Sequence, residues 1–329
     1  MKKKNAAQTT ASDLLGAASN EELLRRERRA NSAWSKLRRN KTAMVGLIIV
    51  CVMVFIAVFA PLLAPYDPTA VNPVGAFLKP GVDGHLLGTD NVGRDLLSRI
   101  LYGARVSLLV AFGGTVVAGI IGIILGLIAG YFGGIVDSVI MRIMDGMLAF
   151  PYILLAIILM TVLGSGIFNV ILAIGIGNVP SFARVVRGEV HIIKNEEYCN
   201  AARVIGVSNT RMLLTHILPN TISPLIVYAT LGIAGAIISE AALSFLGLGI
   251  SEPTASWGSI LQTGKNWLNN YPYIATYSGL FILITVLGFN LLGDGVRDVL
   301  DPKMKKGWGR TWRHIRRESA AGWMRFCRS

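Results

Sequence analysis

The sequence is poor in the residues from which catalytic and metal sites are built. It has 3 cysteines and 4 histidines among 329 residues. Cys51, Cys199 and Cys327 show neither a disulfide pairing pattern nor metal-ligand spacing. The chain also lacks a GxxxxGK[ST] phosphate loop and an HExxH motif. We therefore expect reduced, structural cysteines, no metal site and no cofactor bound by this chain.

One short stretch, Gly-Ser-Gly at 164–166, is a weak match to a membrane serine protease. Such a serine needs a base beside it within the membrane. All the histidines fall outside the apolar segments described next: His85, His191, His216 and His314. We therefore predict that this chain has no catalytic residues and is not an enzyme.

Charge is also scarce, because only 16% of residues are charged while 53% are hydrophobic and the mean hydropathy is +0.54. Soluble domains seldom have this composition, which argues against the alternative of a large soluble core. About 20 apolar residues suffice for a helix to cross a bilayer. The sequence predicts an all-α integral membrane protein whose six transmembrane helices lie near 43–64, 106–130, 139–163, 168–186, 222–248 and 273–292.

The basic residues that account for the net charge of +13 gather in the segments expected to lie outside the bilayer. They concentrate before residue 43, between 184 and 211, and after 297. The positive-inside rule therefore places both termini and the fourth connection in the cytoplasm. The predicted parts are a basic tail with an interfacial helix (1–42), the first span (43–64), an extracytoplasmic loop (65–105), a five-span core (106–296) containing cytoplasmic segment 187–220, and a basic tail (297–329). We expect the tails to contact membrane lipid rather than nucleic acid.

Within the spans, small residues recur at every fourth position from Ala118 to Gly130. They predict a close helix–helix contact, which could be static or sliding. Pro151 and Pro180 predict kinks in the third and fourth spans. No internal repeat of the kind found in many secondary transporters is visible.

Two acidic residues are candidates for the translocation path. Asp145 lies three residues from Arg142, so an ion pair near the membrane interface is the alternative. Glu240 has no basic neighbour in sequence and either lines the path or pairs with another helix.

Both long extracytoplasmic loops are expected to be partly ordered. Asp95 predicts the N-cap of a short amphipathic helix that lies on the membrane surface and leads into the second span. In the later loop, 249–272, we expect Trp257 and Trp267 to lie near the interface.

The fourth connection contains a soluble-looking stretch, "YCNAARVIGVSNTRMLLTHILPN", at 198–220. Residues 198–205 predict a short helix that Gly206 ends in a left-handed conformation. Ser208 or Asn209 then caps a second helix that we expect to end at Pro219.

That stretch resembles the EAA signature of permease subunits of ABC importers. The matching positions are Ala201, Ala202, Gly206, Leu218 and Pro219. Asn200 stands where Glu is usual and His216 where Ile is usual. The motifs "LLGTDNVGRDLLSRILYGARVSL" (86–108), "LSFLGLGISEPTASWG" (243–258) and "LLGDGVRDVLDPKMK" (291–305) resemble the C-type permease subunit of dipeptide and oligopeptide importers.

The resemblance covers roughly residues 34–306 and implies a type I ABC importer permease in a bacterial or archaeal cell membrane. It implies a second permease subunit, two ATPase subunits that bind ATP and Mg, an extracytoplasmic solute-binding protein and a peptide substrate. It also implies an ATPase-coupling role for Tyr198, Asn200, Ala201, Ala202, Arg203, Gly206, Leu218 and Pro219. The alternatives are a nickel-chelate or glutathione importer and, in a different class, a stand-alone secondary transporter or channel.

Overall fold

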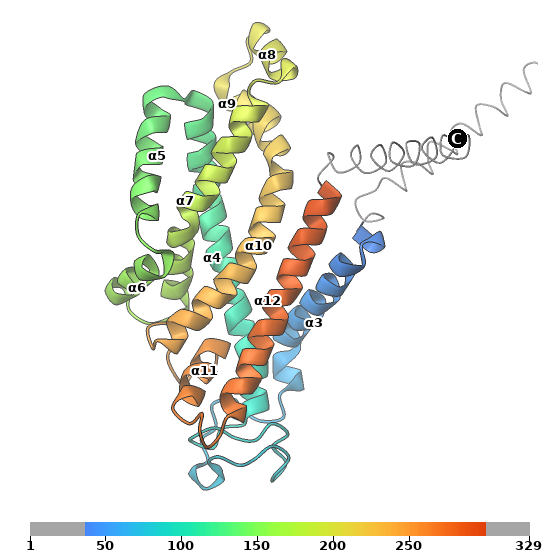
Figure 1. The fold of residues 1–329 in the computed structure, drawn as a ribbon, viewed down its shortest axis with the longest axis vertical. Coiled ribbons are helices and arrows are strands. Elements are labelled where there is room, and N and C mark those ends of the chain that lie inside the picture. Colours follow the sequence, from blue (N-terminus) through green and yellow to red (C-terminus); the bar gives the residue numbers. More distant parts are fainter. Residues whose placement is uncertain (1–36, 301–329) are drawn as a thin grey trace, which may run out of the picture. The chain divides into compact units, whose positions relative to one another are not determined.

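The computed structural model describes residues 37–300, and this part of the chain is mainly helical (Figure 1). It forms two units, one of residues 45–293 and a small one in which residues 37–44 meet 294–300. In the small unit the Asn40 side chain donates to the Asp298 carboxylate at 3.1 Å. The predicted interfacial helix before the first span and the basic tail after residue 300 lie outside the described residues.

Five helices in the described part are long and apolar enough to cross a membrane: α3 (Lys41–Leu63), α4 (Leu96–Phe132), α7 (Ile167–Ile193), α10 (Leu218–Phe245, preceded by α9, Asn209–Arg211, and a π-helical stretch, Met212–Ile217) and α12 (Tyr273–Leu300). A sixth crossing comes from a bent pair, α5 (Gly134–Leu148) and α6 (Tyr152–Leu163). The shorter helices are α8 (Glu197–Val204), α11 (Trp257–Lys265) and a 3₁₀ turn (Pro73–Gly75). The all-α fold with up to six spans is thus confirmed.

The third span is broken rather than kinked. We expected one helix over 139–163, but α5 and α6 meet at 89°. Pro151 lacks a backbone N–H and disfavours helical geometry at Phe150, so the chain leaves the helix there. Pro180, in contrast, lies inside an unbroken α7.

The second span is longer than predicted. Asp95 caps it as expected, since its carboxylate accepts from the Ser98 N–H at 2.8 Å. The expected surface helix, however, is the first part of α4, which continues for 37 residues. Nothing between Ile100 and Val106 can stop a helix, because that stretch has no proline and its only glycine, Gly103, is buried against Trp257.

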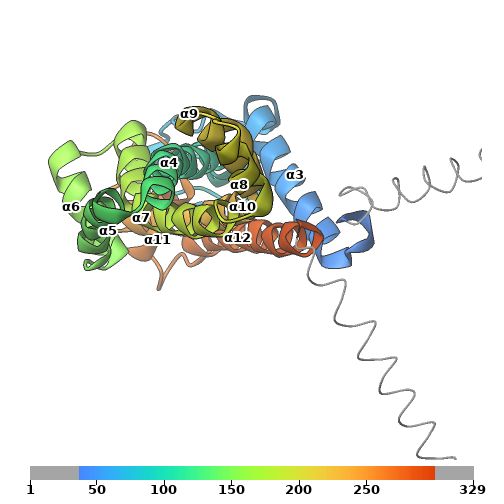
Figure 2. The ribbon, with the colours of Figure 1, turned by 90° about the horizontal axis from the view of Figure 1, so that it is seen from above.

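The core of the larger unit is the pair α4 and α7, against which α10 packs (Figures 1 and 2). The small residues of α4 make the predicted close helix–helix contact, and the structure identifies α7 as the partner. A Cβ on Gly126 would lie 2.6 Å from the Ala183 carbonyl, and one on Gly130 would lie 2.8 Å from Val190 Cβ. The two backbones can approach this closely only because side chains are absent there.

At the end of this unit opposite α8, the 65–95 loop packs on the region around α11. Phe77 stacks on Tyr271 with ring centroids 4.2 Å apart and meets Trp267 edge-on at 4.7 Å. Trp257 differs from the prediction of an interfacial residue. It is fully buried, and its indole N–H donates to the Ile100 carbonyl at 3.1 Å. The buried partner for its single polar group makes it a core residue.

Candidate functional site

The predicted helix and turn at 198–206 are present at one end of the larger unit, where α8 projects beyond the neighbouring helices (Figure 1). Gly206 has φ +80°. Its N–H donates to the Arg203 carbonyl at 3.0 Å, and the Val207 N–H donates to the Ala202 carbonyl at 3.1 Å. This double pattern is the Schellman ending of a helix, which requires the left-handed conformation that glycine adopts without strain.

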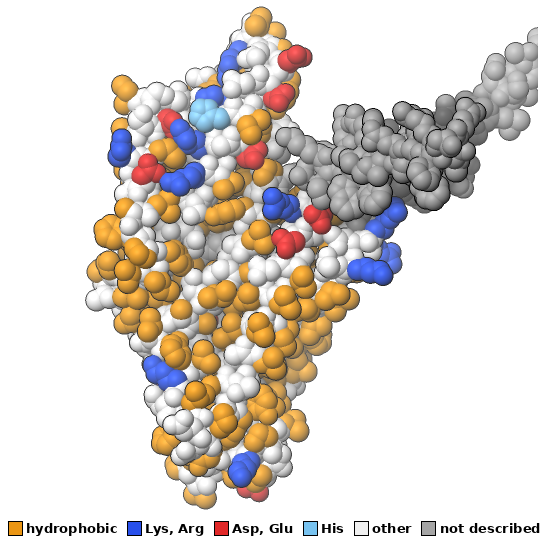
Figure 3. All heavy atoms as spheres, in the orientation of Figure 1, with side chains coloured by type: hydrophobic (Ala, Val, Ile, Leu, Met, Phe, Trp, Pro, Cys, Tyr) orange, Lys and Arg blue, Asp and Glu red, His pale blue; other side chains and the backbone are white. Residues whose placement is uncertain are grey.

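The two faces of α8 differ sharply. Cys199 and Ala202 are buried against the bundle. Beyond them, Val204 is 88% exposed and Ile205 is 80% exposed. On the face drawn in Figure 3, charged side chains also gather around the ends of α5, α7 and α8. Two bulky aliphatic side chains therefore protrude from a polar tip, which is typical of a surface that another protein covers.

The second helix does not end at Pro219, contrary to the prediction. From Asn209 the chain stays helical through the π-helical stretch and into α10. Pro219 occupies the first turn of α10, where a missing N–H costs least. The π-helical stretch (Met212–Ile217) is a rare geometry that is frequently found at functional sites.

Asn200 and Arg203 bind to their own segment. The Asn200 amide donates to the Asn195 carbonyl at 3.4 Å. The Arg203 guanidinium donates to the Asn200 side-chain oxygen and to the Lys194 carbonyl, both at 3.3 Å. At the other unusual position, His216 is half-buried while the next residue, Ile217, is fully buried. Of the two departures from the signature, Asn200 thus makes hydrogen bonds within its own segment.

Asp145 lies in the last turn of α5, and the structure pairs it with Arg184 of α7 at 2.8 Å rather than with Arg142. Both side chains are more than half exposed. A second pair, Arg187 with Asp137, joins the same two helices. The two carboxylates of α5 thus form ion pairs with arginines of α7.

Glu240 is fully buried between helices. Its carboxylate accepts from the hydroxyl of Ser107 on α4 at 2.8 Å and from Ser244 at 2.9 Å. Ser107 in turn accepts from the Trp257 N–H at 3.2 Å. This is the pairing with another helix that was one of the two expected alternatives, while a contact with the path stays a prediction.

An ionic network that the sequence did not reveal lies at the opposite end from α8. Arg94 donates through Nε to Asp90 at 2.6 Å and through its two terminal nitrogens to Glu252 at 2.8 and 2.7 Å. Arg99 lies 3.4 Å from Glu252. Burial alone would raise the pKa of Glu252, but the hydrogen bonds from Arg94 and the charges of both arginines lower it below its ordinary value. Because Arg94 and Glu252 are 158 residues apart, no local pattern could have paired them.

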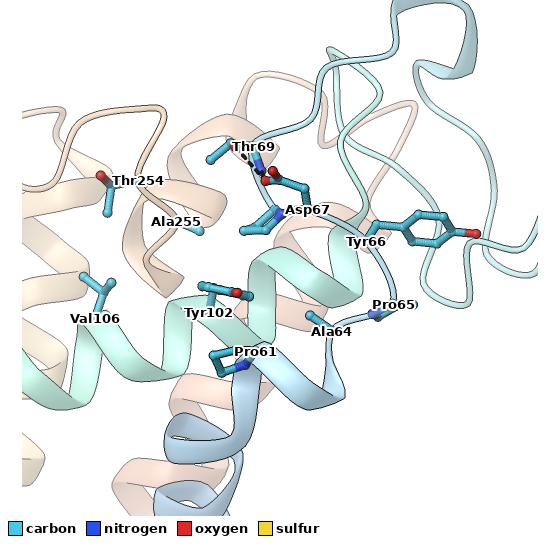
Figure 4. A pocket seen from close by; sticks show the side chains of 11 residues that line it. Pro61, Ala64, Pro65, Tyr66, Asp67, Thr69, Tyr102, Val106, Thr254 and Ala255 are labelled. Atoms are coloured by element: carbon cyan, nitrogen blue, oxygen red, sulfur yellow. Dashed lines mark hydrogen bonds between the residues drawn. The ribbon is translucent and has the colours of Figure 1, made fainter.

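The hollows on the described residues of the larger unit include the following two. The first, of about 660 Å³, lies between the chain after α3, the start of α4 and the loop before α11, and Tyr66, Asp67, Tyr102 and Thr254 are among its lining residues (Figure 4). Asp67 is held by Thr69, whose N–H and hydroxyl both donate to it. The second, of about 440 Å³, is an apolar groove between α4, α7 and α10. Within residues 37–300 no group of three or more His, Cys, Asp or Glu residues is placed to hold a metal ion.

Long apolar helices packed through small residues, one broken span, and a protruding helix and turn with an exposed aliphatic tip define a multi-span membrane protein. The chain belongs to the family of binding-protein-dependent transport system inner membrane components, which residues 122–306 match. Residues 30–80 match the N-terminal transmembrane domain of oligopeptide transport permease C. The chain is thus an inner-membrane permease subunit of the ABC importer type.

The relatives of this chain are named after several different transport substrates. The chain is 47% identical over 273 residues to the dipeptide transport system permease protein DppC of Alkalihalophilus pseudofirmus, covering 83% of this chain and 90% of that protein. It is 43% identical over 274 residues to the oligopeptide transport system permease protein OppC of Bacillus subtilis, with the same coverage. It is 44% identical over 272 residues to the glutathione transport system permease protein GsiD of Escherichia coli, again with 83% and 90% covered.

Among solved structures, the chain is similar to one of the MetNI methionine ABC transporter in inward-facing conformations. The TM-score is 0.50 with 20% sequence identity, over 62% of this chain and 96% of that chain. At this identity the likeness shows the fold alone.

Proposed function

We propose that this chain and a second permease subunit form the translocation path for dipeptides or oligopeptides. Support comes from the dipeptide and oligopeptide permeases to which it is 43–47% identical over most of their length. In this proposal an extracytoplasmic solute-binding protein delivers the peptide. Two cytoplasmic ATPase subunits, which bind ATP and Mg, drive alternating access.

The ATPase subunits dock on α8 and the turn after it. The observation that carries this proposal is the exposed pair Val204 and Ile205 on a helix whose opposite face is buried. An apolar contact centred on these two residues does not need the glutamate that the signature usually supplies. The proposed coupling residues are Tyr198, Asn200, Ala201, Ala202, Arg203, Gly206, Leu218 and Pro219, of which Ala202 is buried and anchors the helix.

Asp145 and Glu240 remain our candidates for the translocation path. Asp145 is the stronger of the two, because its carboxylate and its partner Arg184 are both solvent-accessible beside the break between α5 and α6. Non-helical backbone at membrane depth is tolerated where protein or a water-filled cavity covers it. A path along this break would satisfy that requirement.

The docking proposal is tested at Gly206. No atom lies within 4 Å of a Cβ built there, so the Cβ itself meets no neighbour and its cost is the backbone strain at φ +80°. Asparagine tolerates φ of +80°, whereas a β-branched residue does not. We expect Gly206→Val to insert normally but to lose ATPase subunits and peptide uptake, and Gly206→Asn to retain both. Co-purification of the ATPase subunits is the measurement, and normal recovery with Gly206→Val would contradict the proposed role of the turn.

Glutathione is the second candidate substrate, because a glutathione permease is 44% identical over a similar length. Competition separates the two substrates. We expect a tenfold excess of unlabelled dipeptide, which is about 1.4 kcal/mol in chemical potential, to block the uptake of labelled dipeptide. The same excess of glutathione should leave that uptake unchanged.

A stand-alone carrier is the alternative from another class. Vanadate, or deletion of the partner ATPases, should abolish uptake by the importer. A carrier that acts alone would be unaffected by either treatment.

A further inference from the structure

The last turn of α4 contacts the proposed coupling segment, residues 187–220, at two points, although the two are far apart in sequence. The Lys194 ammonium donates to the Gly130 carbonyl at 2.7 Å. The Tyr131 hydroxyl donates to the Asn209 side-chain oxygen at 2.7 Å. Lys194 precedes α8, and Asn209 follows the turn at Gly206. The chain is therefore bonded to α4 both before α8 and after the turn.

The Lys194 contact also meets a need of α4 itself. Carbonyls in the last turn of a helix have no partner within the helix, and a lysine there satisfies one of them with a favourable charge. Gly130 belongs to this turn, since α4 ends at Phe132. The bond thus replaces a hydrogen bond that the helix cannot make.

Between these points α8 is bonded to Lys194 and packed against the apolar cluster at the end of α4. Arg203 of α8 donates to the Lys194 carbonyl. Cys199 and Ala202 of α8 share one buried apolar cluster with Leu127 of α4, and the Tyr131 ring packs against that cluster. A displacement of α8 therefore pushes on the end of α4 rather than being absorbed in a loose connection.

At its other half α4 contacts the elements at the opposite end of the unit. Its 37 residues form one unbroken helix, about 55 Å long at 1.5 Å per residue. There Ser107 donates to Glu240 of α10 and accepts from the N–H of Trp257, the first residue of α11. One rigid helix thus touches both the coupling segment and the buried network beside α11.

The direct connection from the coupling segment into α10 has a different character. It runs through the π-helical stretch Met212–Ile217, whose hydrogen-bond register differs from that of the α-helices on either side. A change of register within a span favours a local adjustment over rigid transmission. The contacts with α4 bypass this stretch.

We propose that Tyr131 and Lys194 are positioning residues that transmit the movement of the coupling segment to α4 and so keep ATP hydrolysis coupled to peptide import. This inference rests on the proposed function. It predicts variants that still bind the ATPase subunits and hydrolyse ATP but import less peptide for each ATP consumed.

The test uses the complete transporter, with its ATPase subunits and binding protein, in vesicles supplied with a labelled dipeptide. Tyr131→Phe removes only the hydroxyl that reaches Asn209. We expect normal recovery of ATPase subunits and continued ATP hydrolysis. Peptide imported per ATP should fall about threefold to tenfold, the range for one lost hydrogen bond. Lys194→Met, which keeps the aliphatic stem, should have the same effect.

Tyr228→Phe is the matched control. Tyr228 packs edge-on against Phe182 in the same apolar cluster, at 4.8 Å between ring centroids, and this contact does not depend on the hydroxyl. Its peptide-to-ATP ratio should equal that of the wild type. A double variant, Tyr131→Phe with Asn209→Ala, should have the same peptide-to-ATP ratio as Asn209→Ala alone. Either change by itself already removes the hydrogen bond between Tyr131 and Asn209, so the second change has nothing further to remove.

Two results would overturn the inference while leaving the proposed function intact: a wild-type peptide-to-ATP ratio in Tyr131→Phe, or additive losses in the double variant. Failure of the proposed function looks different. In that case the wild-type complex itself retains no ATPase subunits or imports no dipeptide.

Discussion

Replacing Arg94 by methionine removes the centre of the ionic network at the α11 end of the larger unit. The Arg94 side chain is 4% exposed, and its guanidinium makes one hydrogen bond to Asp90 and two to Glu252. Methionine fills the space of the aliphatic stem but supplies no donors. The change therefore removes the charge contacts between the 65–95 loop and the loop before α11 while keeping most of the packing, so it measures what these contacts contribute to stability.

In the Arg94→Met variant, the carboxylates of Asp90 and Glu252 contribute unequally to the loss in free energy of unfolding. Breaking a fully buried ion pair costs about 3–5 kcal/mol. Asp90, at 2% exposed, still accepts from the backbone N–H groups of Val92 and Arg94, which lowers the cost at that site. Glu252 is 42% exposed and becomes hydrated, so its share is below about 1 kcal/mol. We expect a total of about 2–4 kcal/mol, somewhat below the cost of breaking a fully buried pair because both carboxylates keep other stabilising contacts.

Thermal unfolding of the detergent-solubilised transporter measures this effect. For a chain of 329 residues, an unfolding entropy of about 2.1 cal/mol/K per residue means that one kcal/mol shifts the melting temperature by about 1.5 °C. Arg94→Met should therefore lower the melting temperature by about 3–6 °C. Arg184→Met is the matched control, since Arg184 and Asp145 make an ion pair of similar length, 2.8 Å, with both side chains more than half exposed. The control should cost less than about 1 kcal/mol. Equal shifts in the two variants would refute the reasoning from burial.

Three further outcomes are expected. Because the folded pKa of Glu252 lies below its ordinary 4.5, its network should stabilise the fold above about pH 4.5 and lose that contribution as the pH falls through the folded value; melting temperatures between pH 7 and 3 measure this. Gly126→Ala should destabilise by about 1–3 kcal/mol by forcing α4 from α7, whereas Gly146→Ala, with open space at its Cβ, should not destabilise; a similar shift in both would contradict the packing account. Glu240→Leu, which leaves the Ser107 hydroxyl without its acceptor, should cost about 1–3 kcal/mol more than Glu240→Gln in thermal unfolding.

Local signals in the sequence predicted the elements that depend on local chemistry. Long apolar runs predicted the positions of the spans, because an apolar segment within a bilayer has few alternatives to forming a helix. Asp95 predicted the start of α4, and Gly206 predicted the end of α8, because both act through hydrogen bonds within a few residues.

Features that depend on distant packing could not be predicted in the same way. Pro151 and Pro180 carry the same local signal, yet the first separates α5 from α6 and the second remains inside α7. Much of α7 is buried, and it packs along α4, which holds it straight, whereas only two residues of α5 and two of α6 are buried. Asp145 likewise bonds to a residue 39 positions away rather than to its neighbour Arg142.

The exposed aliphatic tip of the coupling segment needed both sequence and structure. The sequence predicted a helix and a glycine turn there, but not that Val204 and Ile205 would point outward while Cys199 and Ala202 are buried. Periodicity over eight helical residues leaves the direction of the apolar face undetermined. The structure supplies this direction, on which the proposed docking surface rests.

The most direct test of the account is the uptake of a labelled dipeptide into vesicles that contain this chain, its partner permease and the ATPase subunits, with the loaded binding protein outside. The account predicts uptake that requires ATP, stops with vanadate, and is lost when Val204 and Ile205 are both replaced by aspartate although the permease pair still assembles. Uptake that persists without ATP, or that survives the double replacement, would contradict it.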